Sequence, residues 1–333
     1  MNQLRWGILS TASIGRKHVM PAINNAKNAE IKAIASRSKE SADELAADYK
    51  AVISYGSYDE LIASDNIDAV YIPLPNNLHF EWAEKALRSG KDVLCEKPLT
   101  LSKEDTVKLF NIAEETGNQL VEGFMYRHRE ITKKLIDVTI EEIGQIHRVR
   151  VDFSFKSSRR NDDIRFQKEL GGGALYDVGC YGVDFILKLL GKPDSLFNKF
   201  TISELSEVDL YGAAIFSYPR IQSIITYSIG SDGNKNIEIS GEYGRIIAPD
   251  FFSAQKSGEE SFYLYGGKSY SKDNIEEFKF EATDVYQEEI EAVSRAFLDD
   301  LKVQPYPEES ILNQHVIDVM CESNRKGLEM IFD

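Results

Sequence analysis

Residues 4–15 read Leu-Arg-Trp-Gly-Ile-Leu-Ser-Thr-Ala-Ser-Ile-Gly. The apolar run at 4–9 has the length and composition of a short buried strand, and a helical pattern follows over residues 13–27. A strand that turns directly into a helix leaves free backbone N–H groups at the helix N-terminus, and these suit a phosphate. This stretch therefore predicts the first βα unit of an open α/β sheet.

The turn between this strand and helix aligns with the G-x-G-x-x-G dinucleotide fingerprint. Ser10, Ala12 and Gly15 occupy the three glycine positions, so only the third glycine is present. Serine and alanine are the smallest substitutes where the backbone must approach a pyrophosphate closely. We therefore expect the turn to bind cofactor phosphates. The expected contact residues are Ser10, Thr11, Ala12, Ser13 and Ile14.

Beyond the turn, strand and helix patterns alternate with short connections. Further strands are expected at 31–35, 69–72, 92–95 and 119–122. Helices are expected at 42–49, 57–64, 78–89 and 102–116. The last helix begins at a Ser-x-x-Asp capping box and is closed by Gly117. The alternation predicts a doubly wound, parallel Rossmann sheet, which we assign to a domain of residues 1–123.

After residue 123 polar and apolar residues alternate, as is typical of half-exposed antiparallel strands. Strands are expected at 147–155, 211–218, 223–229, 236–240 and 245–248. Helices are expected near 128–140, 174–190, 284–302 and 310–330. We therefore predict a second domain, residues 124–333, of α+β class with a large, open, mainly antiparallel sheet.

The composition excludes several classes of protein. A net charge of −15 over 333 residues disfavours nucleic acid and anionic membrane surfaces as partners. No apolar run approaches the roughly 20 residues that span a bilayer, and the N-terminus has no apolar signal core. Cys95, Cys180 and Cys321 are widely spaced and form no CxxC. We therefore expect a reduced, cytoplasmic protein without a disulfide framework or a metal site.

The second predicted strand is followed by Ser36, Arg37, Ser38 and Lys39, without an acidic residue. A site for NAD usually places a carboxylate here to bind the ribose 2′-hydroxyl. Arg37 is suited instead to a 2′-phosphate, with donors from Ser36, Ser38 and Lys39. The alternative is a polar helix start in which Ser38 is the N-cap. We favour NADP as the cofactor.

Residues 73–79, Pro-Leu-Pro-Asn-Asn-Leu-His, follow the strand at 69–72. Two prolines make this a rigid loop, and we expect Pro73, Pro75 and Asn76 to line the nicotinamide pocket. His79 fits two interpretations, either a capping or packing histidine or a member of the cofactor site.

Glu96, Lys97 and Pro98 follow the strand at 92–95. Proline biases the residue before it away from helical torsions, so the strand should end in a defined bend. The carboxyl ends of strands are where an open α/β sheet binds ligands. We expect Glu96 and Lys97 to border the cofactor, the alternative being a turn with a solvated lysine.

A glycine run at 171–173 precedes the helix at 174–190. The helical period places Asp177, Tyr181 and Asp184 on one face, and small residues beside them allow close packing. Oxidation of an alcohol needs a proton acceptor, and a free tyrosine has a pKa of about 10, too high for it to act as a good base at neutral pH. A nearby ammonium lowers a tyrosine pKa, so Lys97 and Tyr181 form a plausible proton-transfer pair. Asp177 would orient the lysine or the substrate hydroxyl.

These motifs and their spacing resemble the Gfo/Idh/MocA family of oxidoreductases over nearly the whole chain. The matching runs are Glu96-Lys97-Pro98, Pro75-Asn76-x-x-His79 and Gly172-Gly173-x-Leu175-x-Asp177-x-Gly179-x-Tyr181. The resemblance implies a Rossmann domain followed by an open-sheet domain through which members form dimers or tetramers.

Tyr181 stands where many family members carry histidine, which points away from inositol dehydrogenase. Together with the Ser-Thr-Ala-Ser-Ile-Gly turn and Ile164-Arg165-Phe166, it resembles the branch of dihydrodiol dehydrogenase, NADP-dependent xylose dehydrogenase and deoxysugar 3-ketoreductases. The resemblance implies that Arg165 and the loop 156–169 border the substrate, although an exposed basic loop is the alternative. The expected substrate contacts are Lys97, Arg165, Asp177 and Tyr181.

The sequence thus predicts an NADP(H)-dependent oxidoreductase that acts on a sugar or polyol and forms a homodimer or homotetramer. Two alternatives stay open. One is a trans-dihydrodiol dehydrogenase acting on a similar vicinal diol. The other is a catalytically silent NADP sensor, because fold analogy alone does not establish catalysis. His79 and His128 are the next candidate proton-transfer residues if the lysine–tyrosine pair is not the one used.

Overall fold

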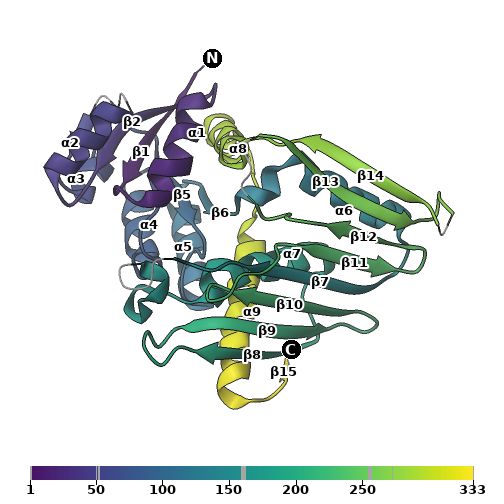
Figure 1. The fold of residues 1–333 in the computed structure, drawn as a ribbon. Helices are drawn as coiled ribbons and strands as arrows, with labels where there is room; N and C mark the ends of the chain where they lie inside the picture. Colours follow the sequence, from purple (N-terminus) through teal and green to yellow (C-terminus); the bar gives the residue numbers. More distant parts are fainter. Residues whose placement is uncertain are drawn as a thin grey trace. The chain divides into compact units, whose positions relative to one another are not determined.

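The computed structural model describes residues 2–49, 51, 53–158, 163–253, 257–271 and 273–332. The chain divides into two compact units, both drawn in Figure 1. The first unit comprises Met1–His128 and Thr283–Ile311, and the second comprises Arg129–Ala282 and Leu312–Asp333. This division differs from the expected single boundary after residue 123, because the segment Thr283–Ile311 groups with the first unit.

The first unit is built on a six-stranded sheet with the order β3-β2-β1-β4-β5-β6. All its strand pairs are parallel, which confirms the predicted Rossmann sheet. The strands are β1 (Leu4–Leu9), β2 (Ala29–Ala35), β3 (Ile53–Tyr55), β4 (Ala69–Ile72), β5 (Asp92–Glu96) and β6 (Leu120–Gly123). Strand β3 was not expected, since three residues are too few to display a period.

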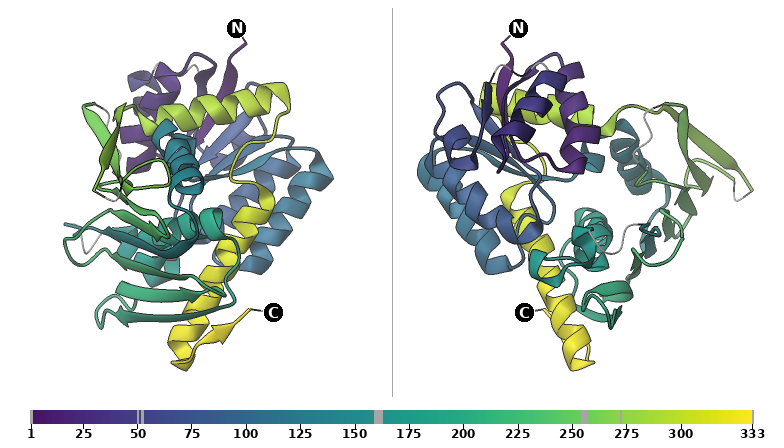
Figure 2. Two further views of the ribbon diagram at one scale, coloured as in Figure 1. Left: turned by 90° about the vertical axis from the view of Figure 1, so that its right-hand side faces the viewer. Right: turned by 60° about the vertical axis from the view of Figure 1, so that its left-hand side comes forward.

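Helices cover this sheet, and their ends agree with the local sequence signals. They are the π-helix η1 (Gly15–Val19), α1 (Met20–Asn25), α2 (Lys39–Asp48), α3 (Tyr58–Ile62), α4 (His79–Arg88), α5 (Lys103–Thr116) and α8 (Val285–Asp299). The Ser102 side chain accepts a hydrogen bond from the Asp105 N–H, and Gly117 ends α5 in the left-handed region, as predicted. Helix α4 packs on α5, and α1 packs on α8, as Figure 2 shows for the latter pair.

Helix α8 joins the first unit because it packs on strand β1. The fully buried indole of Trp6 donates a hydrogen bond of 3.0 Å to the Ser294 hydroxyl, and its ring lies 5.9 Å from the Phe297 ring. The amphipathic pattern of the helix predicts a buried face but does not name the strand that the face covers. The predicted boundaries place α8 in the second domain, whereas the structure groups it with the first unit; a helix was expected at 284–302 and is observed at Val285–Asp299.

The second unit is built on a nine-stranded sheet with the order β14-β13-β12-β11-β7-β10-β9-β8-β15. Its strands are β7 (Ile146–Ser154), β8 (Ser195–Ile202), β9 (Asp209–Ser217), β10 (Gln222–Ser228), β11 (Ile237–Gly241), β12 (Gly244–Ala248), β13 (Glu259–Gly266), β14 (Ile275–Glu281) and β15 (Met330–Ile331). Among the strands of the described residues, only β7 and β10 pair in parallel in this sheet, so the predicted mainly antiparallel sheet is confirmed.

Four strands of this sheet were not expected from the sequence: β8, β13, β14 and β15. Strand β14 reads Ile-Glu-Glu-Phe-Lys-Phe-Glu, and glutamate and lysine are depleted in strands. It forms an edge of the sheet, where charged side chains discourage further pairing. Strand β15 lies where the last helix was expected to continue, but that helix ends at Lys326.

Helices α6 (Glu130–Glu142) and α7 (Cys180–Leu190), and the part of α9 (Pro307–Lys326) from Leu312 onward, complete the second unit. The π-helix η6 (Leu175–Gly179) leads into α7. A Cβ atom added at Gly182 would lie 3.2 Å from Ile225 Cγ2 and 3.4 Å from Val151 Cγ1. The predicted close packing of this helix is therefore directed at β7 and β10. In the part of the chain that the structure describes, no helix is both long and apolar enough to cross a membrane.

The contact between Trp6 and α8 can be tested by Ser294→Ala. The substitution leaves a buried indole N–H without its acceptor, so we expect the free energy of unfolding of the first unit to fall by about 1–3 kcal/mol. Urea unfolding followed by tryptophan fluorescence measures the change. The exposed Ser89→Ala is the matched control and should shift the free energy by less than about 0.5 kcal/mol. Equal midpoints for the two variants would contradict this assignment.

Candidate active site

The turn after β1 has the backbone conformation that the dinucleotide fingerprint requires. Ser10, at the first glycine position, adopts a φ of 83°, a region that non-glycine residues seldom occupy. Its N–H donates to the Ala35 carbonyl (2.8 Å), and its hydroxyl accepts from the Ala12 N–H (3.2 Å). Glycine would adopt this φ without a steric penalty, whereas Ser10 adopts it with a hydrogen bond from the Ala12 N–H to its own side chain. This geometry supports the alignment of the turn with the fingerprint.

Gly15, at the third position, lies close to β4 and the loop after it. An added Cβ atom would stand 3.6 Å from Pro73 Cγ and 3.7 Å from Tyr71 Cε1, which is ordinary contact. A Cβ atom would therefore fit at this position, and the distances show no steric requirement for glycine here. The helical turn at residues 15–19 keeps its start near the carboxyl ends of β1 and β4, where an anion gains from helix N–H groups.

Two exposed cations, Arg37 and Lys39, follow the end of β2. Among the described residues, no hydrogen bond or ion pair involves the Arg37 side chain. Lys39, by contrast, forms an ion pair with Asp43 and donates to the Ser54 hydroxyl (2.8 Å). Ser38 caps α2 by accepting from the Ser41 N–H, which confirms the alternative interpretation of Ser38 as an N-cap, while its contact with a cofactor stays a prediction. Arg37 is therefore the residue of this group best placed to receive a phosphate.

The loop that carries Lys97 is held at the residues on both sides of it. The Tyr71 hydroxyl donates to Glu96 Oε1 (2.7 Å), and burial together with this carboxylate raises the pKa of Tyr71 well above its usual value. After Lys97, the Leu99 N–H donates to Glu122 Oε1 (2.9 Å). The Lys97 side chain is partly buried, and its peptide bond to Pro98 is cis.

His79 is fully buried at the start of α4. Its Nδ1 lies 2.8 Å from the Pro98 carbonyl oxygen, and its Nε2 lies 2.8 Å from the Leu74 carbonyl oxygen. Burial lowers the pKa of His79, and the positive charge of Lys97 acts in the same direction. Both ring nitrogens are thus engaged with the protein, which favours the packing interpretation over direct cofactor contact.

In the second unit, Asp177 has the charged partner that its position on an apolar helix demanded. Arg165 Nε donates to Asp177 Oδ2 (2.7 Å), and Arg165 Nη1 donates to Asp163 Oδ1 (3.2 Å). Asp163 in turn accepts from the Ser157 hydroxyl (3.0 Å). Of the predicted substrate loop 156–169, residues 159–162 lie outside the described residues.

The glycine run has a steric reason. A Cβ atom at Gly172 would lie 2.6 Å from the Arg165 carbonyl oxygen, and one at Gly173, where φ is 127°, would overlap the Asp209 carboxylate. Asp209 Oδ2 accepts from the Leu175 N–H (2.7 Å) at the start of η6. The glycines therefore allow Arg165 and Asp209 to approach the helix that carries Asp177.

Tyr181 lies among aromatic rings. Its ring centroid is 5.4 Å from that of Phe153 and 5.8 Å from that of Phe252, and those two rings are stacked 5.2 Å apart. Only 6% of Tyr181 is exposed. Lys97 belongs to the first unit, whereas Asp177 and Tyr181 belong to the second, and the pairing of Lys97 with Tyr181 stays a prediction.

Sequence reasoning did not identify Asp163, Asp209 or Phe252 as part of these sites. Asp163 lies two residues before Arg165, and this spacing matches an Asx-type cap, which was an available signal. Asp209 and Phe252 are far from the helix in sequence, and only strand pairing and packing bring them there. No local pattern marks such residues.

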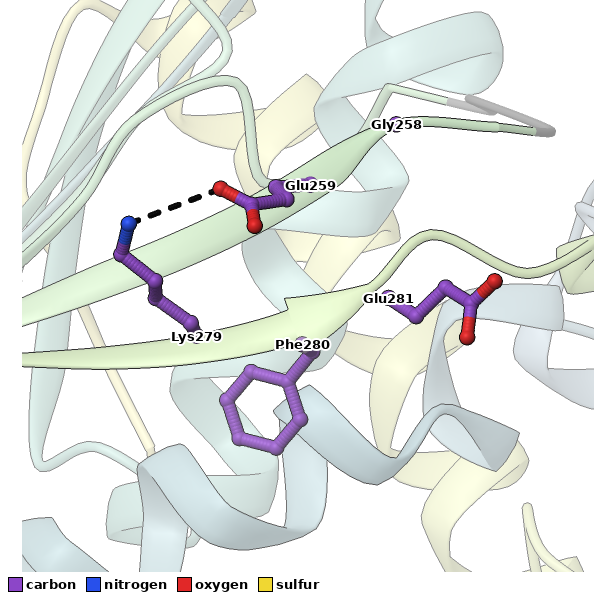
Figure 3. Close-up of a pocket in the computed structure, with 5 residues that line it drawn as sticks. All are labelled: Gly258, Glu259, Lys279, Phe280 and Glu281. Carbon is purple, nitrogen blue, oxygen red and sulfur yellow. Dashed lines mark hydrogen bonds and ion pairs between the residues drawn. The ribbon is translucent and has the colours of Figure 1, made fainter.

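A surface pocket of about 570 Å³ lies on the edge hairpin of the second unit (Figure 3). It is lined by Gly258, Glu259, Lys279, Phe280 and Glu281. The Lys279–Glu259 pair (3.5 Å) is exposed, and exposed pairs contribute little energy. None of the predicted site residues lines this pocket, so it carries no argument about the chemistry. Within the described ranges, no group of three or more His, Cys, Asp or Glu side chains is placed to hold a metal ion.

Asp209 should make stability depend on pH. Burial raises the pKa of Asp209 to about 6, above the unfolded value near 3.9. The neutral acid is thus favoured in the folded state, and this contribution is lost as the pH rises through about 6. We expect the melting temperature of the wild type, relative to Asp209→Asn, to be higher at pH 5 than at pH 7.5. A difference that does not change with pH would contradict the raised pKa.

Comparisons with known proteins agree with this architecture. Residues 4–124 match the model "Oxidoreductase family, NAD-binding Rossmann fold", and residues 133–247 match the model "GFO/IDH/MocA C-terminal domain". The D-xylose 1-dehydrogenase (NADP(+)) 2 of Haloferax volcanii is 35% identical over 99% of this chain and 100% of that protein. The trans-1,2-dihydrobenzene-1,2-diol dehydrogenase of Xenopus tropicalis is 29% identical over 74% of this chain and 75% of that protein.

A solved structure, a 3-ketoreductase from Actinomadura kijaniata in complex with NADP and TDP-benzene, superposes with a TM-score of 0.90. The two chains are 28% identical, and the match covers 97% of this chain and 98% of the other. The family resemblance inferred from the lysine–proline and glycine–aspartate motifs is thereby confirmed. With both sheets and both halves of the sequence in agreement, this chain belongs to the Gfo/Idh/MocA family of oxidoreductases.

Proposed function

We propose that this protein is an NADP(H)-dependent oxidoreductase that transfers a hydride between nicotinamide and a carbon of a sugar or polyol. The observation that carries the proposal is the placement of Asp177 and Tyr181 one helical turn apart, with Arg165 bound to Asp177. A carboxylate, a guanidinium and a phenol provide acceptors and donors for a substrate with several hydroxyl groups. Relatives of this chain are named for D-xylose, for a dTDP-linked didehydro-dideoxyglucose and for a dihydrobenzene diol, which supports a sugar or diol substrate.

The residues present fit NADP. Ser10 adopts the positive φ that glycine favours, and the Arg37 side chain, just after β2, has no hydrogen bond or ion pair among the described residues. Residues 36–39 contain no acidic side chain. When bound, this cofactor supplies the hydride acceptor, C4 of the oxidised nicotinamide ring. Pro73, Pro75 and Asn76 are proposed to line that ring, and Ser36 and Ser38 are proposed to assist Arg37.

Side chains of the protein accept and donate the proton of the substrate hydroxyl. As the substrate carbon loses its hydride, the hydroxyl proton passes to the phenolate oxygen of Tyr181, and the carbonyl double bond forms. The ammonium of Lys97 stabilises the phenolate before this transfer, as nearby positive charge does. Asp177 orients the reacting hydroxyl, and Arg165, which donates to Asp177 Oδ2, holds Asp177 in place. In reduction of a ketone, the same proton travels back from Tyr181.

A trans-dihydrodiol dehydrogenase is the second candidate, supported by the relative from Xenopus tropicalis and by the Phe153–Phe252 stack beside Tyr181, which suits an apolar ring. Aldoses, nucleotide-linked 3-keto sugars and cyclic trans-diols should be compared by following NADPH absorbance. Turnover of a sugar supports the proposal, and turnover of diols alone supports the second candidate. Tight NADP binding without turnover of any compound would instead support an NADP sensor.

The exposed face of the second sheet supports assembly into a homodimer or homotetramer. Phe197, Ile215 and Ile224 pair across β8, β9 and β10, and Phe197 and Ile215 are 39% and 44% exposed. An apolar row on an open sheet is typical of a protein interface. We expect light scattering to give a mass of at least two chains, and Ile215→Glu to lower it. A monomeric wild type would contradict this assembly.

Arg37 should determine the preference for NADP. A charge-assisted hydrogen bond contributes about 1.5–3 kcal/mol, so Arg37→Ala should weaken NADP binding by roughly 10–100-fold. NAD affinity should change little, because NAD has no 2′-phosphate. Titration by calorimetry measures both. Lys39→Ala is the control, since Lys39 is already paired with Asp43, and its effect should be small. Equal affinity of the wild type for NADP and NAD would contradict the assignment.

Tyr181 and Lys97 should act as one unit. Tyr181→Phe and Lys97→Met should each lower turnover by roughly 10²–10⁴-fold. Tyr181→Phe removes only a hydroxyl, so it should leave NADP affinity nearly unchanged. The double variant should be little worse than either, because groups that act together are strongly non-additive. The measurement is a pH–rate profile for the wild type, the two single variants and the double variant. Tyr218→Phe, which loses a hydroxyl bonded to the Gly191 carbonyl, is the control. Losses that simply multiply would show that the pairing is wrong.

A further inference from the structure

We propose that His79 is a positioning residue for Lys97, which it controls by holding the loops after β4 and β5 together. The proposal rests on the proposed function, since it assumes that Lys97 takes part in proton transfer. It assigns His79 a role different from the cofactor contact expected from the sequence.

The geometry is that of a bridge between two backbones. Leu74 follows β4 and Pro98 follows β5, and the carbonyl oxygens of both lie 2.8 Å from opposite nitrogens of one imidazole ring. The ring is 0% exposed, so water does not compete for either carbonyl. A buried ring placed between the two carbonyls sets the spacing of the two loops, and it donates a hydrogen bond to at least one of them.

The Pro98 carbonyl belongs to the peptide between Pro98 and Leu99, so its contact with His79 fixes the backbone immediately after Lys97. Proline has no N–H, and this carbonyl is therefore the only backbone group of Pro98 able to accept or donate a hydrogen bond. The neighbouring residues are already fixed, Glu96 by the Tyr71 hydroxyl and Leu99 by Glu122. His79 supplies the third point of attachment, between the other two.

The ring chemistry limits which substitutes can serve. A neutral imidazole has one N–H and donates to one carbonyl, whereas an imidazolium donates to both. Burial lowers the pKa of His79 and the charge of Lys97 acts in the same direction, while the two carbonyls favour the protonated ring. A glutamine amide can donate to one carbonyl and partly replace the bridge, but leucine fills the space without any donor.

The test compares His79→Leu with His79→Gln, each alone and combined with Lys97→Met. Loss of the bridge lets Lys97 shift, and a misplacement of about 1 Å costs on the order of 100-fold in rate. We expect His79→Leu to lower kcat by roughly 10–100-fold, with NADPH affinity nearly unchanged. His79→Gln should recover part of the loss. In the Lys97→Met background, neither substitution at His79 should lower kcat further.

A readout independent of turnover separates this proposal from the proposed function. Hydrogen exchange at the Leu99 amide should be faster in His79→Leu than in the wild type, whether or not a substrate is known. Asn118→Ala is the matched control: it removes a side-chain bond of 2.9 Å to the Leu87 carbonyl, before β6 rather than after β5. It should lower stability without changing kcat or exchange at Leu99.

Three results would overturn the role of His79. One is a large loss of NADPH affinity with kcat at saturation unchanged, which indicates cofactor contact. Another is a rate loss that multiplies with that of Lys97→Met, which indicates a general structural effect. The third is unchanged exchange at Leu99 in both His79 variants. If His79→Leu does not fold, the same three measurements are made on His79→Gln.

A wild type without turnover on any substrate would instead count against the proposed function. Hydrogen exchange at the Leu99 amide would still test whether His79 holds the two loops together.

Discussion

The parallel pairing of β4 with β5 is the constraint on which the site in the first unit depends. Ile72 pairs with Cys95, so the two strands end side by side at the same edge of the sheet. The prolines of one loop and Lys97 in the other are therefore neighbours by backbone geometry alone. A one-residue shift in register would separate the Leu74 and Pro98 carbonyls and break the bridge through His79. Sheet hydrogen bonding thus positions the candidate catalytic lysine before any side chain contributes.

In the second unit, close packing of the helix on the sheet positions the site residues. Gly182 allows its helix to approach Ile225 and Val151, and Gly173 leaves room for the Asp209 carboxylate at the helix start. A carboxylate near a helix N-terminus satisfies N–H groups that would otherwise lack partners. Buried as it is, Asp209 pays a desolvation cost that raises its pKa to about 6. The same helix start that needs this carboxylate also carries Asp177.

Charge partners distinguish residues that the sequence treats alike. Arg37 and Lys39 are two cations in one polar turn, yet Lys39 is paired with Asp43 and the Arg37 side chain extends from the end of β2 without a partner among the described residues. Similarly, Asp177 is paired with Arg165, whose side chain is 40% exposed. Helical periodicity placed Asp177 on the face of Tyr181, but it contained no information on which cation lies opposite. Three-dimensional contacts decide which charges are free to bind a ligand.

The sequence by itself determined the two fold classes, most of the strands of the Rossmann sheet, and the motifs that place the chain in its family. These features depend on periodicity, helix caps and motif spacing, which can be read from the local sequence without tertiary contacts. Only the tertiary structure decided that α8 packs on Trp6, that Asp209 caps the helix carrying Asp177, and that His79 is bound to two carbonyls rather than open to a ligand. Each of these contacts joins residues distant in sequence or buries a polar group. Their energy comes from packing and desolvation in the folded state, which no local pattern encodes.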